Sequence, residues 1–162
     1  MDRHTQRFRP AVRIAASTNG KPRILFACVG NTCRSVLAEY LTRHGFGDYA
    51  EPSSAGLRPQ KPADAENAVL TLSTFGIDAS NHQPRSLDTV DLHSFDIIIA
   101  MKKDIAREVL AKYSLPADRL RVWNIADPFG DNLEEYQRCA RKILVELRKL
   151  LRPKGYNRDA TR

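Results

Sequence analysis

The stretch Arg23-Ile-Leu-Phe-Ala-Cys-Val-Gly-Asn-Thr-Cys-Arg-Ser35 decides the fold class of this chain. It opens with Arg23 and the apolar run from Ile24 to Val29, and a segment of this kind is typical of a strand buried on both faces of a sheet. Gly30 and Asn31 end this strand. A helix is predicted next, because four residues at helical spacing share one face: Leu37, Tyr40, Leu41 and His44.

The same alternation of strand and helix signals continues through the rest of the chain. Strands are expected at 23–29, 49–54, 96–101 and 119–123, and further helices at 64–75, 105–113 and 131–151. We expect Gly45 and Gly47 to end the first helix, Gly76 the second and Pro153 the last. The pattern predicts a single three-layer α/β domain, in which helices flank a four-stranded parallel sheet.

The positive charge of the chain is concentrated at its two ends. Lys and Arg number 26 against 19 Asp and Glu, a net charge of +7. Residues 1–21 hold five bases and one acid, and residues 152–162 hold four bases and one acid, which leaves 17 of each in residues 22–151. The body is therefore formally neutral, so nucleic acid is expected to bind only weakly, through the basic tails.

We divide the chain into a basic, disordered N-terminal extension (1–21), one domain (22–151) and a basic C-terminal tail (152–162). The extension is Arg-rich and acid-poor like an organellar transit peptide, but disorder is the better interpretation. The longest apolar run has six residues, and a membrane span needs about 18. Three cysteines without a secretory leader indicate reduced thiols, so we expect a cytoplasmic protein that does not contact membranes.

The segment Cys28 to Ser35 has the composition of a phosphate-binding loop placed after the first strand. Its backbone N–H groups can converge on an oxyanion, with Gly30 and Asn31 able to take a positive φ. The following helix adds its N-terminal dipole, and Arg34 can grip two phosphate oxygens at once. The same positive potential stabilises a Cys28 thiolate, which Ser35 is placed to contact. The predicted phosphate-binding residues are Val29, Gly30, Asn31, Thr32, Cys33, Arg34 and Ser35.

Other interpretations of this loop fit the sequence less well. Cys28 as a plain buried cysteine, with Arg34 exposed at a helix start, leaves the Gly-Asn pair between strand and helix unexplained. A metal site is not expected, because Cys28 and Cys33 lack two further ligands at a suitable spacing. A nucleoside-triphosphate loop is not expected either, because the chain has no Gly-x4-Gly-Lys-[Ser/Thr] motif.

At this loop the sequence resembles the low-molecular-weight protein tyrosine phosphatase family, whose signature is Leu-Phe-x-Cys-x-Gly-Asn-x-Cys-Arg-Ser. The other family-like motifs follow in order: Ser54-Ala55-Gly56, Asn81-His82, Arg85-x-Leu87 before a helix near Asp88, Asp96-Ile97-Ile98-Ile99-Ala100-Met101, and Asp127-Pro128-Phe129. The resemblance implies that 22–151 is a phosphatase domain. It implies Cys28 as nucleophile, Arg34 as phosphate clamp and Asp127 as general acid. It further implies that Asn31, Ser54 and His82 hold the loop in place.

Asp127 also suits the general-acid role on its own chemistry, because cleavage of a phosphate ester expels an oxyanion that needs a proton. Pro128 disfavours a helical conformation at Asp127 and holds it in an extended loop. The alternative is a helix-capping aspartate, for which Asp131 or Asn132 is better placed. We expect Cys28 to form a phosphocysteine that water then hydrolyses, with no metal and no cofactor.

The two remaining cysteines have separate expectations. The resemblance suggests that Cys33 forms a reversible disulfide with Cys28 that shields the thiolate from further oxidation. The alternative for Cys33 is a small packing residue. Cys139 lies beside the apolar face of the last helix and is expected to be core.

Two features bear on the substrate, which we expect to be a phosphorylated protein that releases inorganic phosphate. Tyrosine-directed members generally carry a bulky aliphatic residue where this chain has Thr32. Thr32 together with Asp-Pro-Phe-Gly is similar to the protein arginine phosphatase branch. Phe129 offers an aromatic wall for either a phenyl ring or a guanidinium. Phosphotyrosine is the first expectation and phosphoarginine the alternative.

Two rival functions use the same loop. Arsenate reductases that share this scaffold need a relay of additional cysteines, and residues 57–127 contain none. A phosphopeptide-binding module without turnover has no need of Cys28, Arg34 and Asp127 together. Both are therefore less favoured than a phosphatase.

Overall fold

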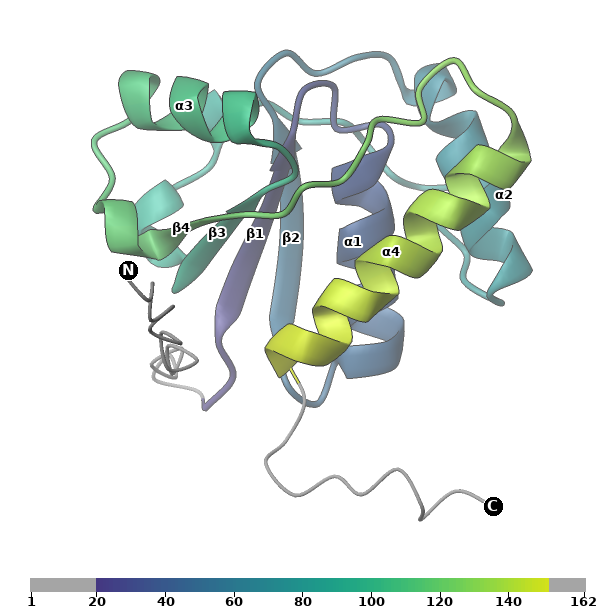
Figure 1. Ribbon diagram of the computed structural model, residues 1–162, viewed down its shortest axis with the longest axis horizontal. Coiled ribbons are helices and arrows are strands. Elements are labelled where there is room, and N and C mark those ends of the chain that lie inside the picture. Colours follow the sequence, from purple (N-terminus) through teal and green to yellow (C-terminus); the bar gives the residue numbers. More distant parts are fainter. Residues whose placement is uncertain (1–19, 152–162) are drawn as a thin grey trace, which may run out of the picture.

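The computed structural model describes residues 20–151, so the proposed basic ends lie, apart from residues 20 and 21, outside the described residues. Four parallel strands form one sheet in the order β2-β1-β3-β4 (Figure 1). The bounds of these strands are Arg23–Cys28 (β1), Glu51–Gly56 (β2), Ile97–Ala100 (β3) and Leu120–Val122 (β4). The expected four-stranded parallel sheet is confirmed.

Helices flank the sheet on both sides, as the sequence predicted. The α-helices are Arg34–Phe46 (α1), Glu66–Thr74 (α2), Lys103–Lys112 (α3) and Leu133–Leu151 (α4). Helix α1 packs against β1 and β2 and is contacted by α2 and α4, whereas α3 packs against β3 and β4 on the opposite side (Figure 1). This arrangement is the expected three-layer α/β domain.

Some predicted boundaries are wrong. Helix α1 continues through Gly45 to Phe46, because packing of its buried face outweighs the modest cost of one glycine in a helix. Strand β2 begins two residues later than predicted, because its register pairs Glu51 with Arg23. The helix expected near Asp88 is a single 3₁₀ turn, and helix α2 is preceded by another such turn at Pro62–Ala65.

The hydrophobic core forms around the two central strands. Ile24, Leu25 and Phe26 of β1 are fully buried, as expected for a strand covered on both faces. The Phe26 ring lies 5.6 Å from the ring of Trp123, which follows β4. This packing joins the first strand to the last and fixes the edge of the sheet from which the functional loops leave.

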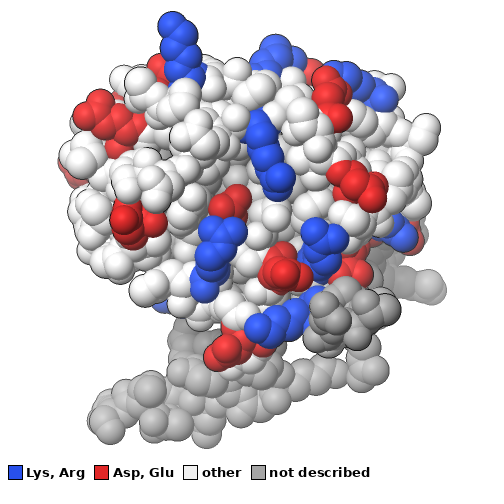
Figure 2. Space-filling view, turned by 180° about the vertical axis from the view of Figure 1, so that it is seen from behind, with Lys and Arg blue, Asp and Glu red and all other residues white. Residues whose placement is uncertain are grey.

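The surface of the domain mixes charges of both signs, as the neutral count for residues 22–151 predicts. Figure 2 shows Lys and Arg side chains interspersed with Asp and Glu over one face. Several are paired, such as Arg58 with Glu108 at 2.9 Å. Among residues 20–151, no helix is long and apolar enough to cross a membrane.

Candidate phosphate-binding site

The segment between β1 and α1 folds into a loop at the carboxyl edge of the sheet. Strand β1 lies between β2 and β3, so the loop leaves the sheet where the strand order reverses, which is the place where parallel sheets bind ligands. Asn31 adopts a positive φ of 54°. Gly30, which we expected to be able to share this conformation, does not adopt it. Asn31 is therefore the residue of this loop that takes a positive φ.

The end of β2 and the segment after it hold the loop from one side. A Cβ atom added at Gly56 would lie 2.6 Å from the Val29 carbonyl oxygen and 2.9 Å from the Asn31 nitrogen. Only glycine permits this approach. Three backbone N–H groups of residues 57–60 then donate to the carbonyls of residues 28–30 at 2.9 to 3.1 Å. The first part of the loop, residues 28–30, is thus clamped by backbone contacts.

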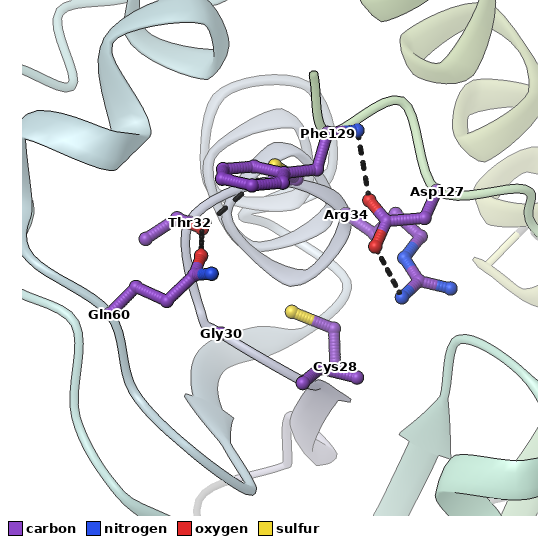
Figure 3. Close-up of a pocket in the computed structure, with 9 residues that line it drawn as sticks. Cys28, Gly30, Thr32, Arg34, Gln60, Asp127 and Phe129 are labelled. Atoms are coloured by element: carbon purple, nitrogen blue, oxygen red, sulfur yellow. Dashed lines mark hydrogen bonds and ion pairs between the residues drawn. The ribbon is translucent and has the colours of Figure 1, made fainter. Parts of the chain in front are cut away.

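The predicted nucleophile and its predicted partner are in contact. Cys28 is 2% exposed and its Sγ atom points into the pocket described below (Figure 3). The Sγ atom lies 2.8 Å from the Oγ atom of Ser35. Ser35 is the second residue of α1 and is fully buried. The geometry agrees with the predicted contact between Ser35 and the Cys28 sulfur.

Asn31 is the centre of a buried network that holds the loop. Its Nδ2 atom donates to the Oγ atoms of Ser35 and Ser54, both at 2.9 Å. Its Oδ1 atom accepts from the backbone N–H of Arg85 at 3.0 Å, and its carbonyl oxygen lies 2.8 Å from Nε2 of His82. The structure therefore brings Asn31, Ser54 and His82 together around the loop, as the resemblance implied.

Arg34 is buried, with 3% of its surface exposed, and its guanidinium faces the loop after β4. The Nη1 atom donates to the carbonyl oxygen of Ile125 at 3.1 Å, and Nη2 donates to Oδ2 of Asp127 at 3.2 Å. Among the described residues, the Nε atom of Arg34 is the buried side-chain polar atom without a hydrogen-bond partner. The alternative of an exposed arginine at a helix start is wrong.

Asp127 is held at the mouth of the site rather than at a helix end. Its carboxylate is 44% exposed and accepts from Arg34 and, through Oδ1, from the backbone N–H of Phe129 at 3.1 Å. The first turn of α4 is capped instead by Asn132, whose Oδ1 atom accepts from the N–H of Glu135 at 3.1 Å. Of the two residues expected to cap this helix, Asp131 and Asn132, Asn132 is the one that does so.

These groups surround one pocket. It is lined by Cys28, Val29, Gly30, Thr32, Cys33, Arg34, Gln60, Asp127 and Phe129. Figure 3 shows Asp127 and Arg34 on one side, Thr32 and Gln60 on the other, and the half-exposed ring of Phe129 across the mouth. The Oγ1 atom of Thr32 donates to Oε1 of Gln60 at 2.6 Å.

Cys33 and Cys139 are both buried thiols. Burial raises the pKa of Cys33 to about 11, and its Sγ atom lies 3.2 Å from the hydroxyl of Tyr136 on α4. Burial raises the pKa of Cys139 to about 12. Both groups are therefore neutral thiols near pH 7. The expectation that Cys139 is core is confirmed, because it is 5% exposed within the main hydrophobic cluster.

Two residues at the site were not predicted from the sequence. Gln60 lies after β2, outside any motif, and nothing in the sequence marks it. Glu39 is 8% exposed on α1 and accepts from the Ser54 hydroxyl at 2.8 Å. A signal for Glu39 did exist, because Ser35, Glu39 and Thr42 place polar groups at helical spacing on the buried side of α1. The structure shows no cluster of metal-ligating residues within 20–151.

Known proteins that are similar to this chain identify its family. The profile of the family described as low molecular weight phosphotyrosine protein phosphatase matches residues 23–161. The chain belongs to this family. Family membership identifies the fold and the general chemistry, that of a cysteine-dependent phosphatase, while the substrate differs among relatives.

Three relatives show that proteins similar to this chain carry the names of different activities. A low molecular weight protein tyrosine phosphatase from T. tengcongensis is 33% identical, with a TM-score of 0.73 over 80% of this chain and 97% of that one. The YwlE arginine phosphatase from Geobacillus stearothermophilus is 26% identical, with a TM-score of 0.73 over 80% and 90%. An arsenate reductase from Bacillus cereus is 32% identical over 76% of this chain and 89% of its own.

Proposed function

We propose that this protein is a phosphatase that hydrolyses phosphotyrosine in proteins through a phosphocysteine at Cys28. The observation that carries the proposal is the meeting of Cys28, Arg34 and Asp127 in one pocket, with Ser35 2.8 Å from the Cys28 sulfur. A nucleophile, a cation for the phosphoryl group and a carboxyl group for the leaving atom are the parts that phosphoryl transfer requires.

The loop offers donors for the phosphoryl oxygens. Within the described residues, the backbone N–H groups of residues 30–33 donate to no protein acceptor, so they are available to an oxyanion at the N-terminus of α1. The unpartnered Nε atom of Arg34 lies on the same edge of the guanidinium as Nη2. A phosphate dianion can take this edge in a bidentate contact and release Asp127 toward the leaving group.

The reaction proceeds in two displacements. The Cys28 sulfur attacks phosphorus as the bond from phosphorus to the tyrosine oxygen breaks, and Asp127 gives its proton to that oxygen. A water molecule then attacks the phosphocysteine while Asp127 takes its proton, and the sulfur leaves as a thiolate. Ser35 stabilises the thiolate in both steps, and the phosphate produced carries the oxygen of the water.

Replacement of Cys28 by Ser tests the nucleophile. Turnover of a phosphotyrosine peptide is expected to stop, while binding of inorganic phosphate stays measurable because the loop donors and Arg34 remain. Cys139→Ala is the matched control, since Cys139 lines no part of the pocket and its loss should leave kcat/KM unchanged. Retained turnover in Cys28→Ser would contradict the assignment, and a protein that binds phosphopeptide without any turnover would instead be a binding module.

Phosphoarginine is the second candidate, favoured by the Thr32–Gln60 pair. This pair puts two oxygen atoms at the pocket wall opposite Asp127, where a phosphoguanidinium can donate N–H groups and a phenyl ring cannot. The test compares phosphotyrosine and phosphoarginine peptides in the parent and in Thr32→Ile. An aliphatic side chain should shift kcat/KM toward phosphotyrosine, and an unchanged preference removes the case for phosphoarginine.

Arsenate reduction is disfavoured for this chain despite the names of some relatives. Residues 57–127 contain no cysteine, and Cys33 and Cys139 are neutral, buried thiols, which are poor nucleophiles for a disulfide relay.

The proposed catalytic domain is 22–151, and three unpaired cysteines favour a cytoplasmic location.

A further inference from the structure

Gln60 lies at the mouth of the pocket and is fixed there by three contacts with the loop after β1. Its backbone N–H donates to the Gly30 carbonyl at 3.0 Å, and its Oε1 atom accepts from the Thr32 hydroxyl at 2.6 Å. Its side chain also lies against Gly30, where an added Cβ atom would come 2.6 Å from the Cδ atom of Gln60. The side chain is therefore held over the loop, although the residue as a whole is exposed to solvent.

The hydrogen bond between Thr32 and Gln60 decides which polar groups this side of the pocket offers. An amide oxygen only accepts, so Thr32 gives its hydroxyl proton to Gln60 at 2.6 Å, a much closer contact than the 3.9 Å to the Cys33 sulfur. The Thr32 Oγ1 atom and the Gln60 Oε1 atom then have only lone pairs left for a ligand. Figure 3 shows these two oxygens across the pocket from Asp127. The wall opposite Asp127 thus carries two oxygens that accept hydrogen bonds.

The second step of the proposed reaction needs such acceptors. A water molecule attacks phosphorus with one lone pair, and Asp127 takes one of its two protons. The other proton stays on the oxygen, and it needs an acceptor if the water is to be held in line. Arg34 and the N–H groups of residues 30–33 only donate. Among the side chains that line the pocket, those with oxygen atoms are Asp127, Thr32 and Gln60.

We propose that Gln60 is a further catalytic residue, which together with Thr32 holds the water that hydrolyses the phosphocysteine. The inference rests on the proposed two-step reaction, and it applies to phosphotyrosine and phosphoarginine alike because both give the same phosphocysteine. As the oxygen of the water bonds to phosphorus, the electron pair of the sulfur–phosphorus bond goes to Cys28. One water proton passes to Asp127 and the other stays in the phosphate, so Gln60 neither gains nor loses a proton.

Competition between water and methanol for the phosphocysteine tests this role. Methanol has one hydroxyl proton, which goes to Asp127, and its methyl group replaces the second proton of water. Its attack therefore needs no acceptor on the side of Gln60. With 4-nitrophenyl phosphate as substrate, hydrolysis gives inorganic phosphate and transfer gives methyl phosphate, and phosphorus NMR measures both products. Their ratio depends neither on KM nor on which step limits turnover.

Gln60→Met keeps the length of the side chain and removes the acceptor. Loss of one hydrogen bond corresponds to about a three- to tenfold change in rate, so the ratio of methyl phosphate to phosphate should rise about three- to tenfold. Gln60→Glu keeps an acceptor for the Thr32 proton and for water, so its ratio should stay at the parental value whatever its added charge does to KM. Lys61→Met is the matched control, because Lys61 is the next residue and does not line the pocket. It should behave like the parent.

Rapid acid quenching without methanol measures the hydrolysis of the phosphocysteine itself. Gln60→Met should lose the phosphoryl group from Cys28 about three- to tenfold more slowly than the parent, and Gln60→Glu should lose it at the parental rate. This measurement separates a weaker hold on water from a better fit of methanol against the methionine side chain, which would raise the product ratio alone.

Two results would overturn the proposal. One is a phosphocysteine that is hydrolysed at the parental rate in Gln60→Met. The other is an equal slowing in Gln60→Glu, since the acceptor oxygen would then not be the cause. If Gln60→Met fails to fold, Gln60→Leu removes the same acceptor and carries the same expectation, and parental hydrolysis in that variant also overturns the proposal. A parent protein that forms no phosphocysteine would instead refute the proposed function.

Discussion

Gly56→Ala tests the idea that the end of β2 sets the position of the phosphate-binding loop. The new Cβ atom would lie 2.6 Å from the Val29 carbonyl oxygen, and ordinary contact begins at 3.4 Å, so the two backbones must separate by about 0.8 Å. Overpacking of this kind costs about 1 to 3 kcal/mol. Removing a strand glycine returns about 0.5 to 1 kcal/mol. We expect the free energy of unfolding to fall by up to about 2.5 kcal/mol.

The effect on activity should be larger than the effect on stability. The clash falls on the Val29 carbonyl and the Asn31 nitrogen, at the start of the segment 30–33 whose N–H groups are proposed to bind phosphate. A displacement approaching 1 Å at a catalytic site costs about 10²-fold in rate, so kcat/KM for an aryl phosphate should fall about 10- to 100-fold. Urea denaturation and steady-state kinetics on the same sample measure both quantities.

Gly45→Ala is the matched control for this substitution. Gly45 lies inside α1 and a Cβ atom added there meets nothing within 4 Å. Alanine in a helix is more stable than glycine by about 0.5 to 1 kcal/mol, so this variant should gain stability and keep its activity. If Gly56→Ala retained parental stability and kcat/KM, the account of the loop as clamped by β2 would be wrong.

Three further outcomes follow from individual contacts. Asn132→Ala removes the side chain that caps the N–H of Glu135 and should lower the free energy of unfolding by about 1 kcal/mol, measured by urea denaturation. Phe129→Ala should leave stability within about 0.5 kcal/mol, because the ring is 48% exposed, but should lower kcat/KM for a phosphotyrosine peptide about two- to tenfold through loss of ring stacking. The folded pKa of Cys33 is raised from 9.0 to about 11, so the stability that its thiol contributes is present below pH 9 and lost as pH rises toward 11. Cys33→Ala should therefore show a smaller fall in unfolding free energy across this window than the parent, and equal falls would contradict the burial effect.

The sheet and the loop could be predicted because their signals are local. A short apolar run before Gly30 marks a buried strand, and the residues from Cys28 to Ser35 all lie in one segment whose chemistry is readable. The contact between Cys28 and Ser35 and the position of Asp127 near Arg34 follow from the order of strands and loops in a parallel sheet. These expectations agree with the geometry.

The partners of the loop could not be read from the sequence in the same way. Gln60 reaches Thr32 only because residues 57–60 run beside the loop, and that path depends on where β2 ends. The predicted bounds of this strand, 49–54, lie two residues before the observed ones. The helix end predicted at Gly45 is not observed, because packing of α1 outweighs the weak helix propensity of one glycine. Glu39 was passed over because a glutamate in a helix is normally exposed, and its burial depends on Ser54 and Arg43 arriving from elsewhere in the fold.

Acid quenching during turnover, followed by peptide mass spectrometry, tests the central claim most directly. With a phosphotyrosine peptide as substrate, we predict a phosphoryl group bound to the sulfur of Cys28, formed before phosphate appears and absent in Cys28→Ser. Slowing the second step with Asp127→Ala should leave this adduct detectable for longer with a substrate whose leaving group needs no proton. Phosphate release without a phosphorylated Cys28 at any time during turnover would contradict the account.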